Sequence, residues 1–172
     1  MRAHFNAALT VEEERYGDAI LTTLPERLVK TGPLPGHPRT AALEPRGALW
    51  TEIRVGDRPV QVINTHLGLV PREQQAQATH LAGPRWLGHP DRQGPTILLG
   101  DFNAFNFNDG YVDVMGTIRG VPTPAGEVTL ASPDLVEPNL VLLTERLPAA
   151  ERYSYVFDGS AQAIDHILVS MS

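Results

Sequence analysis

The sequence predicts an α/β or α+β sandwich, in which strands are interspersed with a few helices. Two strand patterns flank a Gly-Asp turn near residue 56, and a stretch rich in Gln, Ala and Leu follows them. Short aliphatic runs typical of strands recur before and after these elements. The length of 172 residues fits a single domain, spanning 1–172.

The first half of the chain contains three strand patterns. Residues 17–24 form an apolar run that Pro25 stops. Residues 31–45 hold four prolines and two glycines, so we expect a loop there. Residues 48–55 and 60–67 surround the Gly56-Asp57 turn, which predicts a β-hairpin.

Helix signals appear next, followed by a short apolar strand. Pro71 suits a first helical turn, and residues 72–87 are predicted to be helical, although Gly83 and Pro84 weaken the end. Residues 96–99, Thr-Ile-Leu-Leu, are too apolar for an edge strand, so we expect a central strand buried on both faces.

The last third combines loops with further short elements. We expect a loop over 101–110, a short helix over 111–118 and irregular chain over 121–143, where four prolines occur. Residues 153–157 and 164–169 have strand patterns, separated by 158–160. The chain therefore ends, by prediction, in strands.

Composition narrows the classes of function. Lys and Arg total 14 against 20 Asp and Glu, which gives a net charge of −6, and Lys30 is the only lysine. Without a basic cluster, a tight grip on nucleic acid is not favoured, although such a substrate stays open. No stretch approaches the roughly 18 apolar residues of a membrane span. No secretory signal is visible, which favours a cytoplasmic location.

The sequence contains no cysteine. Any metal must therefore be held by Asp, Glu, Asn or His side chains, a donor set that favours hard cations.

Polar side chains occur where three strand patterns end. Asn64 and His66 share one face of their strand, Asp101 and Asn103 follow the central strand, and Asp165 precedes a histidine, His166. Each signal has an ordinary structural explanation: a surface histidine, an Asp-x-Asn turn, or a structural hydrogen bond. One residue of the Asp165-His166 pair must face inward whichever way its strand turns.

Taken together, these groups favour phosphoryl chemistry. Strand ends are where α/β folds place their reactive groups. Carboxylates suit a divalent cation and a water molecule, while Asn and His side chains can hold phosphate oxygens. The sequence contains no cysteine nucleophile, Gly-x-Ser-x-Gly elbow or glycine-rich phosphate loop that would compete with this reading.

Four ordered motifs resemble the endonuclease/exonuclease/phosphatase superfamily. They are Tyr-Gly-Asp-Ala-Ile-Leu at 16–21, Asn-Thr-His-Leu at 64–67, Gly-Asp-Phe-Asn-Ala at 100–104 and Ile-Asp-His-Ile-Leu-Val-Ser at 164–170. The resemblance spans nearly the whole chain. It implies a four-layered α/β/β/α sandwich that hydrolyses phosphodiesters or phosphomonoesters with Mg²⁺ or Mn²⁺.

The resemblance also implies roles for individual residues. Asp101 would orient or activate the attacking water, and Asn103 and His66 would contact the phosphate. Asp165 would support the metal together with Asp101. His166 would bond the phosphate or act as a general base. For substrate binding it suggests Asn64 and, more weakly, Arg46, for which a surface salt bridge is the alternative.

The match departs from the superfamily at its amino-terminal side. Complete members begin with a strand that ends in a metal-site Asn, and a later strand supplies the Glu that is the principal metal ligand. The sequence shows neither, and Glu12, Glu13 and Glu14 are interpreted as a solvated charge run.

Three expectations follow from this departure. We expect a sandwich that is only partial, reduced activity, and a homodimer that covers the missing part of the sheet. The alternative function is a catalytically inactive module that serves in interaction or assembly.

Overall fold

The computed structural model describes residues 1–37, 39–40 and 43–170. It has a mixed six-stranded sheet with the order β3-β4-β5-β6-β10-β7. The bounds are β3 (Glu26–Pro33), β4 (Gly47–Val55), β5 (Arg58–His66), β6 (Thr96–Asp101), β7 (Leu140–Leu142) and β10 (Asp165–Ser170). The pair β5-β6 is parallel and the other neighbours are antiparallel. The predicted α/β class is confirmed.

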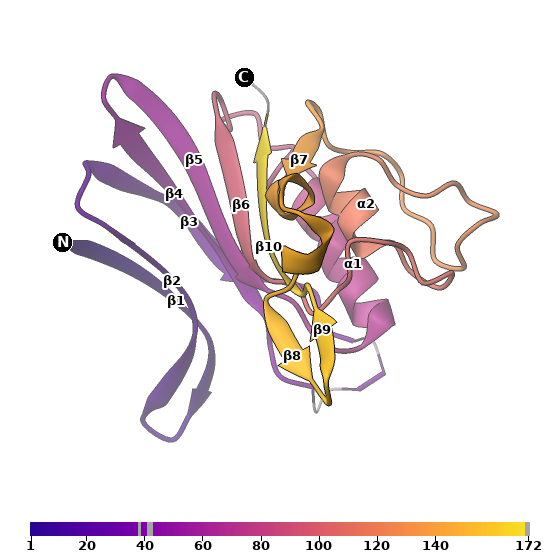
Figure 1. Ribbon diagram of the computed structural model, residues 1–172. Helices are drawn as coiled ribbons and strands as arrows, with labels where there is room; N and C mark the ends of the chain where they lie inside the picture. The colour runs from indigo at the N-terminus through magenta and orange to yellow at the C-terminus, as the bar shows by residue number, and fades with distance from the viewer. Residues whose placement is uncertain (38, 41–42, 171–172) are drawn as a thin grey trace.

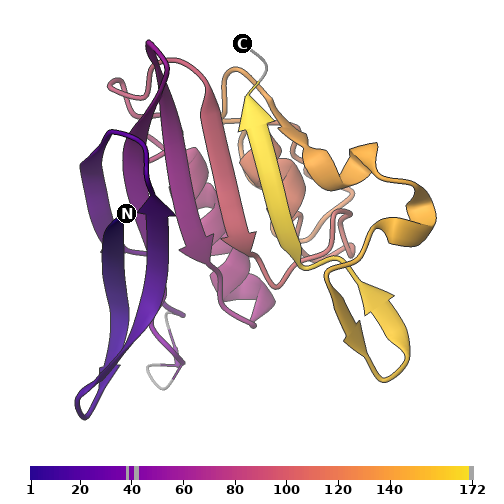
Figure 2. The same ribbon diagram turned by 60° about the vertical axis from the view of Figure 1, so that its left-hand side comes forward.

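Two helices cover one face of this sheet, and a hairpin packs on the other (Figures 1 and 2). The helices are α1 (Pro71–Ala82) and α2 (Val114–Arg119), and the hairpin pairs β1 (Arg2–Val11) with β2 (Glu14–Thr22). The hairpin packs against β3, β4 and β5. The described residues thus form three layers, and they place no helix layer outside the hairpin.

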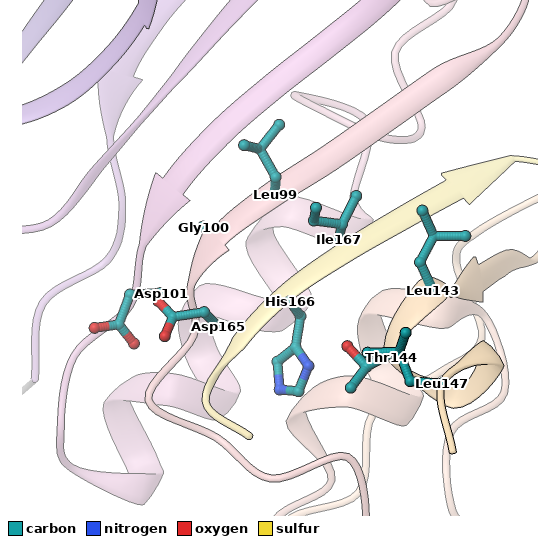
Figure 3. Close-up of a pocket in the computed structure, with 9 residues that line it drawn as sticks. All are labelled: Leu99, Gly100, Asp101, Leu143, Thr144, Leu147, Asp165, His166 and Ile167. Atoms are coloured by element: carbon teal, nitrogen blue, oxygen red, sulfur yellow. The ribbon is translucent and has the colours of Figure 1, made fainter. Parts of the chain in front are cut away.

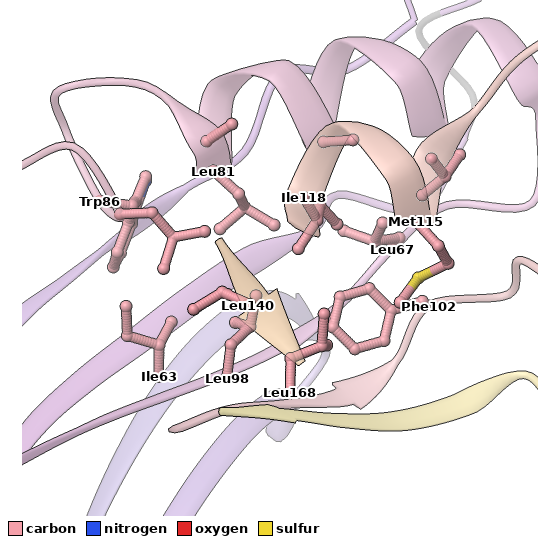
Figure 4. Packing of buried hydrophobic residues seen from close by; sticks show 14 of the residues in the cluster. Ile63, Leu67, Leu81, Trp86, Leu98, Phe102, Met115, Ile118, Leu140 and Leu168 are labelled. Atoms are coloured by element: carbon pink, nitrogen blue, oxygen red, sulfur yellow. The ribbon is translucent and has the colours of Figure 1, made fainter. Parts of the chain in front are cut away.

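The main hydrophobic core lies between the sheet and the two helices (Figure 4). Leu98 of β6, Leu81 of α1 and Ile118 of α2 are fully buried there. Trp50 is also fully buried, and its Nε1 donates a hydrogen bond to Gln61. Burying such side chains contributes about 1.5–3 kcal/mol each, so this layer stabilises the six-stranded sheet.

Several predicted elements are confirmed. The β4-β5 hairpin turns at Gly56, whose φ is 60°, a left-handed value that glycine adopts without strain. The helix begins at Pro71 as expected but ends at Ala82 rather than 87, because the chain turns extended at Gly83 before Pro84. The run Glu12–Glu13 forms the exposed turn of the β1-β2 hairpin, as expected for a solvated charge run.

Other predictions were wrong in detail. The expected loop over 31–45 begins within β3, which ends at Pro33, and residues 38, 41 and 42 of that loop lie outside the described residues. Part of the irregular stretch forms β7. The strand expected over 153–157 is β8 (Tyr155–Phe157), which pairs with β9 (Ser160–Gln162) through the Asp158-Gly159 turn. Two short 3₁₀ turns, η1 (Leu143–Arg146) and η2 (Ala149–Glu151), lie between β7 and β8.

The prediction that β6 is buried on both faces was wrong, and the reason is informative. The strand is central, between β5 and β10, and Leu98 is fully buried against the helices. Leu99, on the opposite face, is only half-buried, and its neighbour Ile167 of β10 is 47% exposed. The reason is that the hairpin reaches only as far as β5, so the β6-β10 half of that face stays open.

Candidate active site

Three neighbouring strands place His66, Asp101 and Asp165 in one row. His66 pairs with Asp101 across the parallel β5-β6 ladder, and Asp101 pairs with Asp165 across the antiparallel β6-β10 ladder. Directly paired residues project from the same face of a sheet. The three side chains therefore lie side by side on the face away from the helices. Figure 3 shows the two carboxylates next to each other at the end of β6.

Gly100 brings β6 and β5 together at this row. Its φ of 147° is strained for any residue with a side chain, and a Cβ there would lie 1.8 Å from the carbonyl oxygen of Thr65. Glycine at position 100 lets β6 stay paired with β5 up to Asp101. This pairing is what places the carboxylate of Asp101 next to His66.

Asp101 and Asn103 form a tight turn after β6. The Oδ1 of Asp101 accepts a hydrogen bond from the Asn103 backbone N–H at 2.9 Å, and Asn103 has a left-handed φ of 48°. The Nδ2 of Asn103 donates to the carbonyl of Leu67 at 3.0 Å and lies 3.2 Å from Nε2 of His66. The turn thus directs the side-chain amide of Asn103 toward the imidazole of His66. Oδ2 of Asp101 takes no part in the hydrogen bond of the turn.

His66 is held between Arg46 and Asp101. Nη1 of Arg46 donates to Nδ1 of His66 at 3.0 Å, and Nε2 lies 3.5 Å from Oδ2 of Asp101. Because arginine cannot accept a hydrogen bond, its contact with Nδ1 favours the neutral tautomer with the proton on Nε2. In this tautomer the 3.2 Å contact between Nε2 and the amide nitrogen of Asn103 is not a hydrogen bond. Burial lowers the pKa of His66, and the charge of Arg46 lowers it further, against the attraction of Asp101. The ring therefore presents an N–H donor beside Asp101.

Arg46 lies behind this histidine rather than at the surface. It is 8% exposed, and its Nη2 lies 3.2 Å from Oε2 of Glu44. Its Nε is buried and has no hydrogen-bond partner among the described residues. The salt bridge expected of Arg46 exists, but it is a buried support of His66.

Asn64 and His166 do not join the row. Asn64 shares the face of His66, but its Nδ2 donates to the carbonyl of Ala19 at 3.0 Å and so ties β5 to the hairpin. His166 pairs with Gly100 and points to the opposite face. It is 2% exposed, its Nε2 lies 2.8 Å from the carbonyl oxygen of Ala104, and burial lowers its pKa. Of the Asp165-His166 pair, the inward residue is the histidine.

Asp18 is a candidate functional residue that the sequence analysis did not single out. It projects from β2 and is 5% exposed. Burial raises the pKa of Asp18 to about 7, while a hydrogen bond from Asn6 and the charge of Arg46 act to lower it. A cavity of about 260 Å³ joins Asp18 to Arg46 and His66. The sequence did contain a sign of this role. Asp18 is two residues from the apolar Ile20 and so shares its face of the strand, which makes Asp18 a charged residue at an inward position.

Asp101 and Asp165 are the residues that fit a divalent cation. Mg²⁺ is commonly held by one or two carboxylates, with water and substrate phosphate as its other ligands. Two facing carboxylates on paired strands match this donor set. No group of three or more His, Asp or Glu side chains suited to a metal occurs in the described part of the chain. A cation here would therefore bind more weakly than in a cage of several carboxylates.

Comparisons with known proteins identify the fold. No protein-family profile matches the sequence, and no curated protein matches it. Among solved structures, the catalytic domain of human Nocturnin, which was solved with bound sulfate, matches with a TM-score of 0.61 at 17% identity. The match covers 98% of this chain and 60% of Nocturnin.

Two further structures agree. ANGEL2, described as a 2′,3′-cyclic phosphatase, matches with a TM-score of 0.59 at 16% identity over 98% of this chain and 63% of its own. An endonuclease/exonuclease/phosphatase family protein from Bacteroides thetaiotaomicron matches with a TM-score of 0.54 at 19% identity over 88% and 53%.

The chain thus has the fold of the endonuclease/exonuclease/phosphatase proteins, as its motifs predict, and spans little more than half the length of these neighbours.

Proposed function

We propose that this chain hydrolyses phosphodiesters or phosphomonoesters at the row formed by His66, Asp101 and Asp165. The observation that carries the proposal is the register that aligns these three side chains on one open face of the sheet. One structural neighbour, ANGEL2, is described as a 2′,3′-cyclic phosphatase and supports the same chemistry. The oxygen of water bonds to phosphorus, one P–O ester bond breaks, and the leaving oxygen departs as an alcohol that takes the proton lost by the water.

Each residue of the row has a proposed task. Asp101, whose Oδ2 is free of the Asn103 turn, orients the attacking water. The Nε2–H of His66 and the amide of Asn103 hold phosphoryl oxygens as negative charge develops. Arg46 is a positioning residue, because its hydrogen bond to Nδ1 keeps the proton of His66 on Nε2.

Mg²⁺ or Mn²⁺ is the proposed cofactor, held by Asp101 and Asp165. Such a cation would neutralise charge on the phosphate and favour ionisation of its bound water. His166 has no direct part in this proposal, since it lies on the opposite face. Asn64 likewise serves the packing of the hairpin.

Two further proposals concern the substrate and the oligomeric state of the chain. The substrate is a phosphate ester, and the net charge of −6 favours a small ester over a long nucleic acid. The chain forms a homodimer through the apolar part of the open β6-β10 face, at Leu143, Leu147 and Ile167, which line a hollow of about 470 Å³. Asp101 and Asp165 border the same hollow, so this contact must leave the two carboxylates accessible to substrate. In the described part of the chain, neither helix has the length and apolar character that crossing a membrane requires.

The direct experiment is hydrolysis of bis(4-nitrophenyl) phosphate with Mg²⁺ or Mn²⁺. We expect turnover that depends on the cation and falls about 100-fold or more in His66→Ala and Asp101→Ala. His89→Ala, which removes a histidine on another part of the chain, should leave the rate unchanged. Unchanged rates in both site variants would refute these roles.

The alternative is a catalytically inactive module for interaction or assembly, and the small number of metal ligands in the described residues favours it. It predicts no turnover and no thermal stabilisation by Mg²⁺ or Mn²⁺. A cation that binds the folded state raises the melting temperature by linkage. A melting curve with and without the cation therefore separates the two functions.

A further inference from the structure

The β1-β2 hairpin places an ionisable side chain in the interior, beside the proposed active site. Asp18 of β2 is 5% exposed and pairs across the hairpin with Asn6 of β1, which hydrogen-bonds to its carboxyl. Nδ2 of Asn6 lies so close to β4 that a Cβ on Gly47 would be 2.5 Å from it. His4, on the same face of β1, is bonded to Glu26 of β3 instead. The carboxyl of Asp18 is therefore held where the hairpin meets β4.

A cavity of about 260 Å³ connects Asp18 with the residues that hold His66. The other charged or titratable side chains on its border are Tyr16 from β2 itself, Glu44 and Arg46 from the segment before β4, and His66 from β5. Burial raises the pKa of Asp18 to about 7, although the charge of Arg46 acts to lower it. Asp18 therefore changes its charge near neutral pH, across a cavity from a guanidinium.

Arg46 is held at two of its three nitrogen atoms. Nη1 donates to Nδ1 of His66 at 3.0 Å, and Nη2 lies 3.2 Å from Oε2 of Glu44. Nε is buried without a hydrogen-bond partner among the described residues. The charge of Arg46 also acts on Glu73 of α1, where burial raises the pKa. Because arginine bonds more strongly to a carboxylate than to a neutral ring, the contact with His66 is the one that an ionised Asp18 would weaken.

The charge of Asp18 thus decides where the guanidinium is held. A neutral carboxyl attracts Arg46 only weakly, so the arginine stays on His66 and favours the tautomer with the proton on Nε2. An ionised carboxyl attracts the guanidinium, and the cavity between them gives the side chain room to move. Once Nδ1 loses this donor, the ring can carry its proton there, and it then presents no N–H at Nε2.

We propose that Asp18 is a positioning residue for the hydrolysis, acting through Arg46 on the proton of His66. Its neutral form keeps this proton on Nε2, where the ring donates to the phosphate, and its ionised form releases it. The inference rests on the proposed function and adds a regulation of the same site by pH. Protonated Asp18 belongs to the active form, so activity declines as the pH rises through about 7.

Long-range ¹H–¹⁵N NMR of the histidine rings tests this link without any turnover. The signals of His66 are identified by their loss in His66→Ala. In the wild type we expect the proton on Nε2 at about pH 6 and a growing share on Nδ1 by about pH 8.5. In Asp18→Asn, which has the same shape and does not ionise, the proton should stay on Nε2 at both pH values. Asp57→Asn, in the exposed β4-β5 turn, is the matched control and should behave as the wild type.

The second measurement is the ratio of kcat/KM between Asp18→Asn and the wild type, with bis(4-nitrophenyl) phosphate as substrate. kcat/KM reports the ionisation of the free protein. The two chains should be equal at about pH 6, and the variant should be roughly 10- to 30-fold faster at about pH 8.5, where most of the wild type has ionised Asp18. Other titrating groups, such as Asp101, act on both chains alike and cancel in the ratio.

A ratio that does not vary with pH would overturn the inference and leave Asp18 with a purely structural role. So would a His66 ring whose proton stays on the same nitrogen in the wild type at both pH values. Absence of turnover in every chain would instead refute the proposed function. The NMR measurement would then still decide whether Asp18 controls the proton of His66.

Discussion

At the scale of single residues, Asp18 shows how burial changes a side chain's chemistry. Its carboxyl is 5% exposed beside Arg46 and His66, and burial raises its pKa to about 7. The unfolded chain has the ordinary value of 3.8. Between these pH values the folded state keeps a proton that the unfolded state releases. The contribution of Asp18 to stability is therefore full below about pH 4 and is lost as the pH rises through about 7.

We predict that Asp18→Asn stabilises the fold at high pH. Relative to the wild type, its free energy of unfolding should be higher by roughly 2–4 kcal/mol at pH 8, with the difference shrinking toward pH 4. Urea denaturation across this pH range measures the effect. Asp57→Asn, in the exposed β4-β5 turn, is the control and should run parallel to the wild type. A difference that does not vary with pH would contradict the raised pKa.

The sequence could predict which polar residues matter at this site, but not all of their orientations. The spacing of Asn64 and His66 correctly puts both on one face, yet only the folded hairpin reveals that Asn64 bonds to Ala19. For Asp165 and His166, a shift of one residue in register exchanges the two faces. The pairing with β6 settles this choice, and no local pattern encodes it.

At the scale of elements, the strength of the local signal decided what could be predicted. The β4-β5 hairpin and α1 carry strong turn and cap residues, Gly56 and Pro71, and both form. Strand β1 was not predicted, because its polar residues face the sheet and its large apolar residue faces solvent. The half-buried His4 and Asn6 face the sheet, while Phe5 is exposed. His4 bonds to Glu26 of β3, so polar contacts replace the usual apolar face.

The close approach of β6 to β5 gives a sharp prediction at this scale. Gly100→Ala should lower the free energy of unfolding by at least about 2 kcal/mol, because its Cβ would overlap the carbonyl of Thr65 and its φ is unsuitable for alanine. Thermal or urea denaturation measures the loss. Gly126→Ala has open space around its Cβ and should change stability little. Equal stabilities of the two variants would contradict the described contact.

At the scale of the whole molecule, the asymmetry of the sandwich is the main feature. The helices bury one face of the sheet completely, whereas the hairpin covers only its β3-β5 half. Ile167 and Leu143 are 47% and 38% exposed on the other half. Exposed apolar surface of this kind is typical of interaction sites. Within this half, only the strand over 96–99 had been predicted to be buried on both faces, and that prediction was wrong.

We predict that the open face mediates self-association. Light scattering coupled to size exclusion should give the mass of a dimer for the wild type and of a monomer for Ile167→Lys, because a buried lysine without a partner is costly. Val55→Lys, at the exposed end of β4, should remain dimeric. A monomeric wild type at micromolar concentration would contradict the dimer without touching the proposed chemistry.

The proposed hydrolytic function is tested most directly by following the oxygen of water into the product. With bis(4-nitrophenyl) phosphate, Mg²⁺ and ¹⁸O-labelled water, phosphorus NMR should show the label in the released phosphate monoester. Asp101→Asn should reduce the rate of labelling about 100-fold or more. Product that forms without the label, or labelling that proceeds at the same rate in Asp101→Asn, would contradict hydrolysis at the row of His66, Asp101 and Asp165.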